Sequence, residues 1–298
     1  MTLTKPNQIV LKKKKPVLDV TGVSRWWIFT NVPFFLLFWI AVAWIAVISF
    51  FTPSIMSLYE PDFSLESYIR VFTNPLYYGT LWDTLWMATI GSFLSVAFAY
   101  PVAYHISRRA GKARSFYTGL VIVVLLVSFL IKMYAWQILL NESSPISQFF
   151  AGFGFPDSFL GTQVGVILGL IYASLPYTIM SLTASVDQVP AAAEEAAACF
   201  GASPLKVFKD IIFPITMPGV ATALIFAIPL NLSAFLAPVL LGRGQVQMTA
   251  LQIYNASAGG GSIANWPLAS ALSVTLLVLS IIFTFGILTI VQKSYSRK

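Results

Sequence analysis

The sequence has little charge and almost no cysteine or histidine. Of its 298 residues, 10% are Asp, Glu, Lys or Arg and 57% are hydrophobic, whereas about a quarter of the residues of a soluble domain are charged. This balance excludes a water-soluble globule, because too little polar surface is available to cover it. Cys199 is the only cysteine, which excludes an intrachain disulfide framework and a cysteine-cluster metal site.

Motifs for nucleotide binding and hydrolysis are also missing. The sequence contains no P-loop, no H-E-x-x-H and no G-x-S-x-G arrangement. The single histidine, His105, ends an apolar run, where an interfacial polar residue is expected rather than a ligand or a base. We therefore predict no catalytic residue, no metal site and no cofactor bound by this chain. The energy for its function must come from a partner or an ion gradient.

Long apolar runs take the place of these motifs. Each is about 20 residues or longer, which is enough for a helix to cross a bilayer. Because backbone groups in lipid must be satisfied internally, and a barrel would show short alternating segments, these runs predict helices. The expected fold class is all-α, a polytopic membrane protein with six transmembrane helices. The predicted spans are residues 28–51, 84–104, 116–140, 164–186, 214–241 and 267–291.

The distribution of basic residues predicts the topology. Fifteen of the 18 Lys and Arg residues lie on one side of the predicted spans, and by the positive-inside rule this side and both termini are cytoplasmic. We expect a basic cytoplasmic tail over residues 1–27, a membrane domain over 28–292 and a cytoplasmic tail over 293–298. No cleavable signal peptide is apparent. No folded basic domain accompanies the net charge of +7, so no nucleic-acid partner is expected.

One polar segment, residues 187–214, has more local order than a simple loop. Pro190 favours the start of a helix, the alanine-rich residues 191–200 favour its continuation, and Gly201 suits a C-terminal cap. Ser203 with Pro204 favours the start of a second short helix. The pattern predicts a helix, a tight turn and a helix on the cytoplasmic side, with small residues that allow close approach of a partner. The alternative is a solvated amphipathic connector.

The same segment resembles the EAA loop of permease subunits of ATP-binding-cassette (ABC) importers, whose pattern is E-A-A, three residues, Gly, nine residues and I-x-L-P. Phe213 stands where the family usually has Leu. In that family the loop forms coupling helices that seat in a groove of the ATPase subunit. The resemblance implies an ATPase-coupling role for the residues of this segment that match the motif and for Glu194, which adjoins it. The matching residues are Glu195, Ala196, Ala197, Gly201, Ile211 and Pro214.

Further stretches across roughly residues 60–292 resemble the spermidine/putrescine-type permeases of this class. They comprise residues 64–68, 99–104, 128–136 and 237–242. Two departures affect ionisable positions that could alter the cargo. Asp83 stands where an Asn is common, and Lys132 replaces an Arg.

The resemblance implies a type I ABC importer permease in a bacterial inner membrane. The implied partners are a second permease subunit in a heterodimer, two ATPase subunits that bind ATP, a periplasmic solute-binding protein and the lipid bilayer. A polyamine-like cargo is favoured. An opine, a phosphonate, an amino-acid-like compound and ferric iron remain alternatives, and a stand-alone secondary transporter is a weaker one.

Five residues are candidates for the translocation pathway. Asp83 and Lys132 are ionisable residues in or beside predicted spans, where such groups usually face a bundle interior or a water-filled cavity. Asn231 lies deep in the fifth span, and Tyr134 and Trp136 could contact a cation through their rings. Each has a structural alternative. Asp83 could cap its helix, Lys132 could snorkel, Asn231 could bond between helices, and the aromatic residues could be packing or interface anchors.

Overall fold

The computed structural model describes residues 20–54, 58–154, 156–258 and 264–296. It divides into two units, residues 1–47 and 48–298. Helix α1 (Val20–Ile48) accounts for the described part of the first unit and runs through Pro33 without a break. At 1.5 Å per residue its 29 residues extend for about 44 Å, more than the thickness of a bilayer core. Residues 1–19 of the predicted basic tail and residues 297–298 of the C-terminal tail lie outside the described residues.

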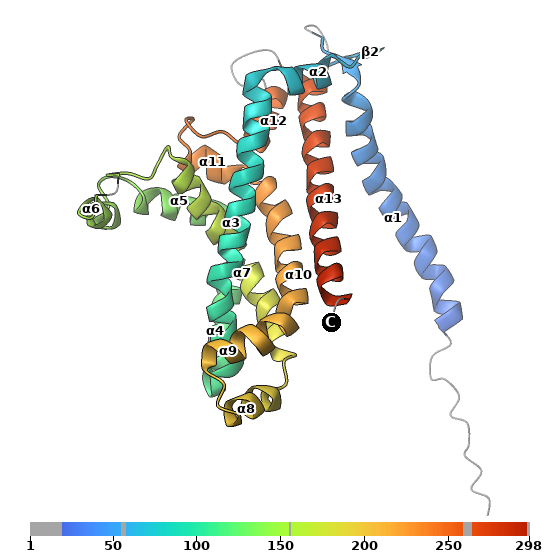
Figure 1. Ribbon diagram of the computed structural model, residues 1–298. Helices are drawn as coiled ribbons and strands as arrows, with labels where there is room; N and C mark the ends of the chain where they lie inside the picture. Colours follow the sequence, from blue (N-terminus) through green and yellow to red (C-terminus); the bar gives the residue numbers. More distant parts are fainter. Residues whose placement is uncertain (1–19, 55–57, 155, 259–263, 297–298) are drawn as a thin grey trace, which may run out of the picture. The chain divides into compact units, whose positions relative to one another are not determined.

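Three helices form the centre of the second unit: α3 (Pro75–Arg108), α7 (Gln163–Asp187) and α10 (Phe213–Leu232). Each of the three packs against the other two, and we call this arrangement the three-helix centre (Figure 1). The starts of α3 and α7 follow from capping chemistry. Asn74 Oδ1 accepts a hydrogen bond from the Leu76 amide at 3.0 Å, and Thr162 Oγ1 accepts one from Gly165. α13 (Trp266–Ser296) packs against α10.

Short elements cover one end of this bundle, which we call the α2 end. The strands β1 (Phe51–Thr52) and β2 (Glu60–Phe63) form a small antiparallel hairpin. The hairpin is followed by α2 (Glu66–Thr73), which contacts both α3 and α13. α12 (Thr249–Ala258) packs beside α13 and α3. The hairpin is the one departure from an all-α fold among the described residues.

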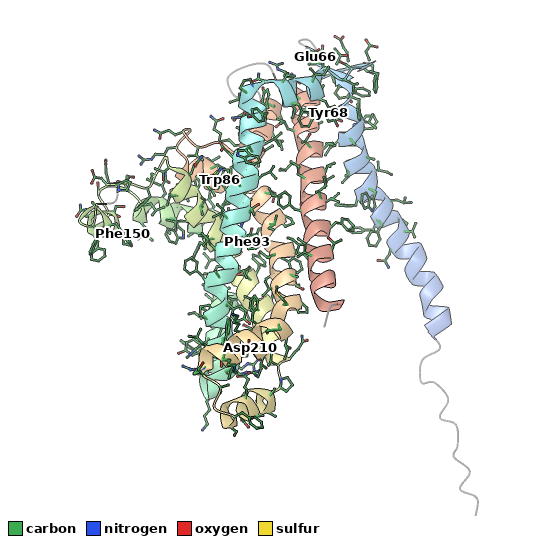
Figure 2. The ribbon with its side chains drawn as sticks, viewed as in Figure 1. Glu66, Tyr68, Trp86, Phe93, Phe150 and Asp210 are labelled. Carbon is green, nitrogen blue, oxygen red and sulfur yellow. The ribbon has the colours of Figure 1, made fainter. Side chains whose placement is uncertain are left out.

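The opposite end carries the polar segment, and we call it the α8 end. α8 (Ala191–Cys199) and α9 (Pro204–Val207) lie there, and α9 continues through a π-helical stretch, η2 (Phe208–Ile212), into α10. Figure 2 shows exposed charged side chains at both ends, Glu66 at the α2 end and Asp210 at the α8 end, with the exposed apolar Phe93 between them on α3. An apolar belt between two charged ends is the pattern expected of a membrane domain.

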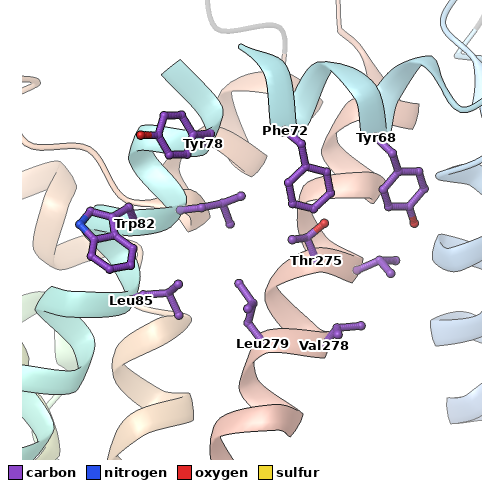
Figure 3. Close-up of a pocket in the computed structure, with 10 residues that line it drawn as sticks. Tyr68, Phe72, Tyr78, Trp82, Leu85, Thr275, Val278 and Leu279 are labelled. Atoms are coloured by element: carbon purple, nitrogen blue, oxygen red, sulfur yellow. The ribbon is translucent and has the colours of Figure 1, made fainter. Parts of the chain in front are cut away.

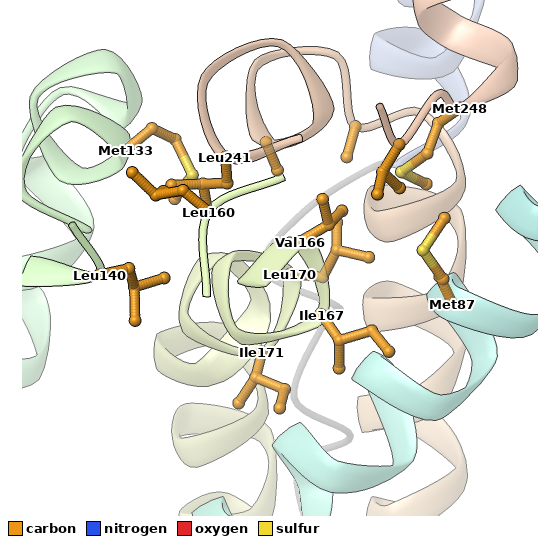
Figure 4. Packing of buried hydrophobic residues seen from close by; sticks show 13 residues of the cluster. Met87, Met133, Leu140, Leu160, Val166, Ile167, Leu170, Ile171, Leu241 and Met248 are labelled. Carbon is orange, nitrogen blue, oxygen red and sulfur yellow. The ribbon is translucent and has the colours of Figure 1, made fainter. Parts of the chain in front are cut away.

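The hydrophobic core is shared between the helices of the three-helix centre and the elements beside it. One cluster surrounds α7 toward the α2 end, and its three methionines, Met87, Met133 and Met248, come from separate segments of the chain (Figure 4). A second cluster lines the contacts of α3, α7 and α10 toward the α8 end. The fully buried members with the largest side chains include Met87, Met133, Leu170, Leu182, Ile228 and Leu241.

The third predicted span is wrong as a single straight helix. Residues 116–140 are divided between α4 (Arg114–Leu126), which follows a short 3₁₀ turn, η1 (Gly111–Ala113), and α5 (Phe129–Leu139). The two helices meet at an angle of 94°. The break occurs because Val127 and Ser128 adopt extended backbone conformations, with ψ near 133° and 134°. α4 packs against α7, whereas α5 contacts α6 (Pro145–Ala151) and α11 (Leu236–Leu241) as well as α7.

Two other predicted boundaries also differ from the structure. The fifth span ends at Leu232, and residues 236–241 form a separate short helix, α11 (Leu236–Leu241). The second span begins at Pro75 instead of near Thr84, so α3 already includes Asp83. In the described residues five helical stretches are long and apolar enough to cross a membrane, and the bent pair α4–α5 raises this number to six. The all-α fold with six candidate spans is therefore confirmed.

Candidate coupling site

The polar segment folds as the predicted helix, turn and helix. Pro190 occupies the N-cap position of α8, and Gly201 ends the helix with φ at +77°, a backbone conformation that favours glycine. The amides of Gly201 and Ala202 donate to carbonyls in the last turn of α8, at 2.9 Å and 3.1 Å. Ser203 Oγ then accepts from the Lys206 amide and starts α9. Pro190, Gly201 and Ser203 thus determine where the two helices begin and where α8 ends.

One face of this segment points away from the rest of the chain. α8 has no buried residue, and Glu195 and Ala196 are exposed. Phe200 and Leu205, on either side of the glycine turn, are 91% and 80% exposed. Ile211 and Pro214 are half-buried, where η2 joins α10. The motif therefore offers an exposed tip at α8 and an anchored base at α10.

Glu194 differs from its neighbour Glu195, because it faces the bundle. Its Oε1 accepts a hydrogen bond from Arg108 Nε at 2.8 Å, and its Oε2 accepts one from the Tyr104 hydroxyl at 3.3 Å. The side chains of Arg108 and Glu194 are only 18% and 16% exposed. A second ion pair joins Arg114 Nη2 on α4 to Asp187 Oδ2 at the end of α7, at 2.5 Å. Charged side chains from α3, α4, α7 and α8 thus converge at the α8 end.

Asn231 lies at the middle of the three-helix centre and is fully buried. Its Nδ2 donates to Ser92 Oγ on α3 at 2.9 Å and to Ser174 Oγ on α7 at 3.4 Å, while its Oδ1 has no hydrogen-bond partner. Further polar contacts cross between these helices, from Ser95 to Thr178 at 3.0 Å. The geometry brings Asn231 into contact with two helices, and its role in solute transfer stays a prediction.

The other predicted pathway residues do not form one site with Asn231. Asp83 is half-buried on α3, and Lys132 is buried on α5. Within the described residues, no ion pair or hydrogen bond joins their side chains to each other. Trp136 packs edge-on against Tyr172 with 5.5 Å between the ring centroids, whereas Tyr134 is half-exposed. Asp83 lies two turns inside α3, so it does not cap the helix; Asn74 does.

Two grooves on the bundle are apolar, and a third between α7 and α10 also has polar residues such as Ser181 and Gln188 in its lining. One groove of about 420 Å³ lies between α2, α3 and α13, lined by residues such as Phe72, Trp82 and Val278 (Figure 3). It contains none of the five predicted pathway residues. Among the described residues, no group of three His, Cys, Asp or Glu side chains could hold a metal ion.

Comparison with known proteins identifies the family. Residues 91–297 match the family described as "Binding-protein-dependent transport system inner membrane component". The chain belongs to this family. The match contains α8, α9 and every residue of the predicted motif, and begins at Gly91 within α3.

Individual relatives agree with this assignment. The permease is 29% identical over 245 residues to the spermidine/putrescine transport system permease protein PotB of Haemophilus influenzae, covering 81% of this chain and 84% of the relative. It is 27% identical to the inner membrane ABC transporter permease protein YdcU of Escherichia coli, covering 74% and 73%. These relatives confirm the resemblance to polyamine-type permeases.

A solved structure confirms the fold. A chain of a bacterial ABC transporter involved in the import of the acidic polysaccharide alginate superposes with a TM-score of 0.71 at 14% identity, covering 92% of this permease and 98% of that chain. At this identity the likeness concerns the arrangement of the helices alone. The type I importer permease fold is therefore confirmed.

Sequence reasoning missed Arg108 in this permease. It counted Arg108 among the basic residues that set the topology, although the side chain binds Glu194 and two backbone carbonyls, of Val186 and Val189. The sequence offered one signal: Arg108 still belongs to the long helix α3, so its side chain could be expected to be partly buried instead of fully solvated. The separation of 86 residues between Arg108 and Glu194 concealed the pairing.

Proposed function

We propose that this chain is the membrane-spanning subunit of an ATP-driven importer that receives a small solute from a periplasmic binding protein. In this proposal a second, similar permease subunit completes the pathway, and two separate ATPase subunits dock on the α8 end. The α8 end and both termini face the cytoplasm. Family membership supports the class of transporter, and a chain without a nucleotide-binding motif is consistent with ATP hydrolysis by separate subunits.

The observation that carries the proposal is the exposed tip of the polar segment. A nine-residue helix in which no residue is fully buried, followed by Phe200 and Leu205 in nearly full exposure, is costly in water unless another protein covers it. The carboxylate of Glu195 lies on α8 without an ion-pair partner in the described residues, and it suits a charge-assisted hydrogen bond to a partner. These features fit insertion into a groove of an ATPase subunit.

The distribution of positive charge supports the proposed orientation. Arg108 ends α3, and Arg109, Lys112 and Arg114 follow it. These four residues lie at the α8 end, where Lys206 and Lys209 also lie. An excess of Lys and Arg in short loops marks the cytoplasmic side of a bacterial inner-membrane protein. ATP is available on that side, so the orientation and the docking of ATPase subunits agree.

Polyamines are the cargo that the relatives favour, since several of them are permeases of spermidine/putrescine systems. In such systems the binding protein supplies much of the selectivity, and the permease needs a pathway that releases the solute. The half-buried carboxylate of Asp83 on α3 and the aromatic rings of Tyr134 and Trp136 are groups to which a polyamine cation would be attracted.

Lys132 favours a second candidate, a cargo that carries an anionic group. Its ammonium group belongs to a buried residue on α5 and has no acidic partner in the described part of the chain. A buried cation favours an anionic ligand over a cationic one. Opines, phosphonates and amino-acid-like compounds meet this condition. Uptake of labelled spermidine and of a labelled opine by the complete transporter in proteoliposomes distinguishes the two cargo classes.

The test of the proposal is association with the ATPase subunit. The complete transporter is co-expressed, solubilised and purified through a tag on this chain, and the bound ATPase subunit is quantified. Glu195→Ala removes a charged contact worth about 1.5–3 kcal/mol, so bound ATPase should fall by about tenfold or more. Gly201→Asp should abolish uptake, because it places an unpaired carboxylate at the exposed tip that the ATPase subunit is proposed to cover.

Glu66→Ala is the matched control. Glu66 is also an exposed glutamate in the first turns of a helix, but it lies at the α2 end. Its replacement should leave ATPase association unchanged. Normal association and normal coupling of ATP hydrolysis to uptake in both Glu195→Ala and Gly201→Asp would refute the proposed role of the segment.

A further inference from the structure

Something other than apolar packing must hold α8 against the bundle. The helix buries none of its nine residues, and a helix shorter than about 12 residues is marginal in water on its own. Its main backbone contacts within the chain are with α9 and η2, its own continuation. Covalent connection alone leaves a helix free to tilt, yet a coupling helix that tilts freely cannot deliver force to the membrane domain.

Arg108 supplies the missing attachment. It lies in the last turn of α3 and makes three side-chain hydrogen bonds, each to a different segment. Nε donates to Glu194 Oε1 on α8 at 2.8 Å. Nη2 donates to the carbonyl of Val186 in the last turn of α7 at 3.0 Å, and to that of Val189 in the connection to α8 at 2.5 Å. One side chain therefore joins α3, α7 and α8.

The residue types suit this task. A guanidinium group presents five donors in a rigid plane, so it can bind a carboxylate and helix-end carbonyls together. The carbonyls of the last turn of a helix have no partner within their own helix, and that of Val186 accepts from the Val189 amide at 3.1 Å as well as from Arg108. Tyr104 lies one turn before Arg108 on the same face of α3 and donates to Glu194 Oε2. Both oxygens of the Glu194 carboxylate are thus bound from α3, and we call these three residues the α3–α8 clasp.

The other ion pair at this end does not reach α8. Arg114 on α4 binds Asp187 on α7, and the two side chains are 47% and 31% exposed, against 18% and 16% for Arg108 and Glu194. Water and salt weaken a pair more as its exposure rises. Of the two ion pairs in the described residues, the better protected is the one that joins α8 to α3.

We propose that the α3–α8 clasp makes α8 and the end of α3 move as one body, so that Arg108 and Glu194 are positioning residues for energy coupling. The movement of α8 passes along α3 to the three-helix centre, where Ser92 on α3 bonds to Asn231 on α10. This inference rests on the proposed function. It separates two neighbouring glutamates, since Glu195 serves docking to the ATPase subunit and Glu194 serves transmission within this chain.

The first test separates docking from transmission in the complete transporter. Arg108→Gln and Glu194→Gln should retain bound ATPase subunit and ATP hydrolysis, while solute uptake per ATP falls by about tenfold. Arg108→Lys should restore little, since an ammonium group lacks the fork that binds three segments. The matched control is Arg109→Gln, because Arg109 is exposed and forms no ion pair in the described residues.

A cross-link tests whether the two segments move together. Arg108→Cys and Glu194→Cys are combined with Cys199→Ser, and a bifunctional thiol reagent joins α3 to α8 in the reconstituted transporter. If the clasp is a rigid attachment, the cross-linked protein should recover uptake per ATP relative to the same protein before cross-linking. A locked protein with no recovery would mean that α8 and α3 separate during the cycle, and this result overturns the proposal.

The outcomes distinguish this inference from the proposed function. If the unaltered chain binds no ATPase subunit, the proposed function fails. If the unaltered transporter couples normally and both Arg108→Gln and Glu194→Gln couple equally well, only the clasp fails. If the Arg108 variants fold poorly, Glu194→Gln still tests the clasp. It replaces one oxygen atom by an amino group on α8, at the α8 end, and it should therefore disturb folding little.

Discussion

The three-helix centre and the α8–α9 segment are held in place by opposite means. Helices α3, α7 and α10 bury much of their surface against one another, and their backbones approach closely. α8 has no buried residue and is fixed by the glycine turn at its C-terminal end and by the clasp from α3. Side-chain volume therefore decides the integrity of the centre, whereas charge and backbone conformation decide the position of α8.

This contrast has a functional meaning. An import cycle requires a membrane domain with two discrete packings and a lever that selects between them. A tightly packed centre does not deform continuously, so it suits the first requirement. A segment with an exposed face, on which we propose that the ATPase subunit docks, and with an attachment made by charged groups, suits the second.

The largest effect should come from a single added methyl group in the centre. A Cβ on Gly219 of α10 would lie 2.2 Å from Ser185 Cβ on α7. Gly219→Ala must push the two helices apart, and overpacking of this kind costs about 3 kcal/mol. The expected result is a lower thermal unfolding midpoint in detergent and a loss of uptake. The midpoint is measured by following unfolding of the purified chain under identical detergent conditions.

Gly79→Ala is the control for this variant. Gly79 is also in a helix of the bundle, but a Cβ there meets no atom within 4 Å. Alanine is the better helix former, so this variant should unfold at the same or a higher temperature. Equal midpoints for Gly219→Ala and the unaltered chain would contradict this prediction. They would show that α7 and α10 can move apart with little loss of stability.

A smaller effect is expected at Asn231. Asn231→Ala removes the amide that bonds to Ser92 and Ser174 and leaves a small cavity, at a cost of about 2 kcal/mol. If Asn231 serves helix–helix bonding alone, the variant should unfold at a lower temperature but keep its apparent affinity for solute in uptake. A changed KM at normal stability would instead assign Asn231 to the solute pathway.

Thr222→Ala is a suitable comparison on the same helix. Thr222 is exposed on α10, and its hydroxyl bonds only to the Pro218 carbonyl one turn earlier. Its replacement removes a polar side chain without touching α3 or α7, so the thermal midpoint should change little. If Thr222→Ala lowered the midpoint as much as Asn231→Ala does, the hydrogen bonds of Asn231 to Ser92 and Ser174 would not be the cause of the loss of stability.

Much of the fold could be predicted from the sequence, because span length and turn chemistry are local properties. The glycine turn at Gly201 and the Ser203 cap follow from residue type alone. The bend between α4 and α5 could not be predicted. Residues 126–129 continue the apolar run with no Pro or Gly to mark a break, and the extended backbone at Val127 and Ser128 depends on tertiary contacts of α5 with α11.

The candidate site could be predicted in part for the same reason. The exposed positions of α8 follow from the polar, alanine-rich composition of the segment. The different roles of Glu194 and Glu195 could not be predicted, since they depend on Arg108 and Tyr104, which lie about 90 residues earlier in the chain. Adjacent residues on a helix point about 100° apart, so one faces the bundle and the other faces outward.

The smallest predicted effect concerns backbone conformation at the tip. Gly201 has φ at +77° and open space around it, so Gly201→Ala adds no clash and costs only the strain of a left-handed residue, about 1 kcal/mol. Asparagine tolerates this conformation better, and Gly201→Asn should cost less. Hydrogen exchange measured by mass spectrometry over residues 191–207 should therefore be fastest for Gly201→Ala and intermediate for Gly201→Asn. Exchange that is equally fast in both variants would mean that the added side chain, and not the strained backbone, causes the loss of protection. The backbone conformation of Gly201 would then not contribute to the position of α8.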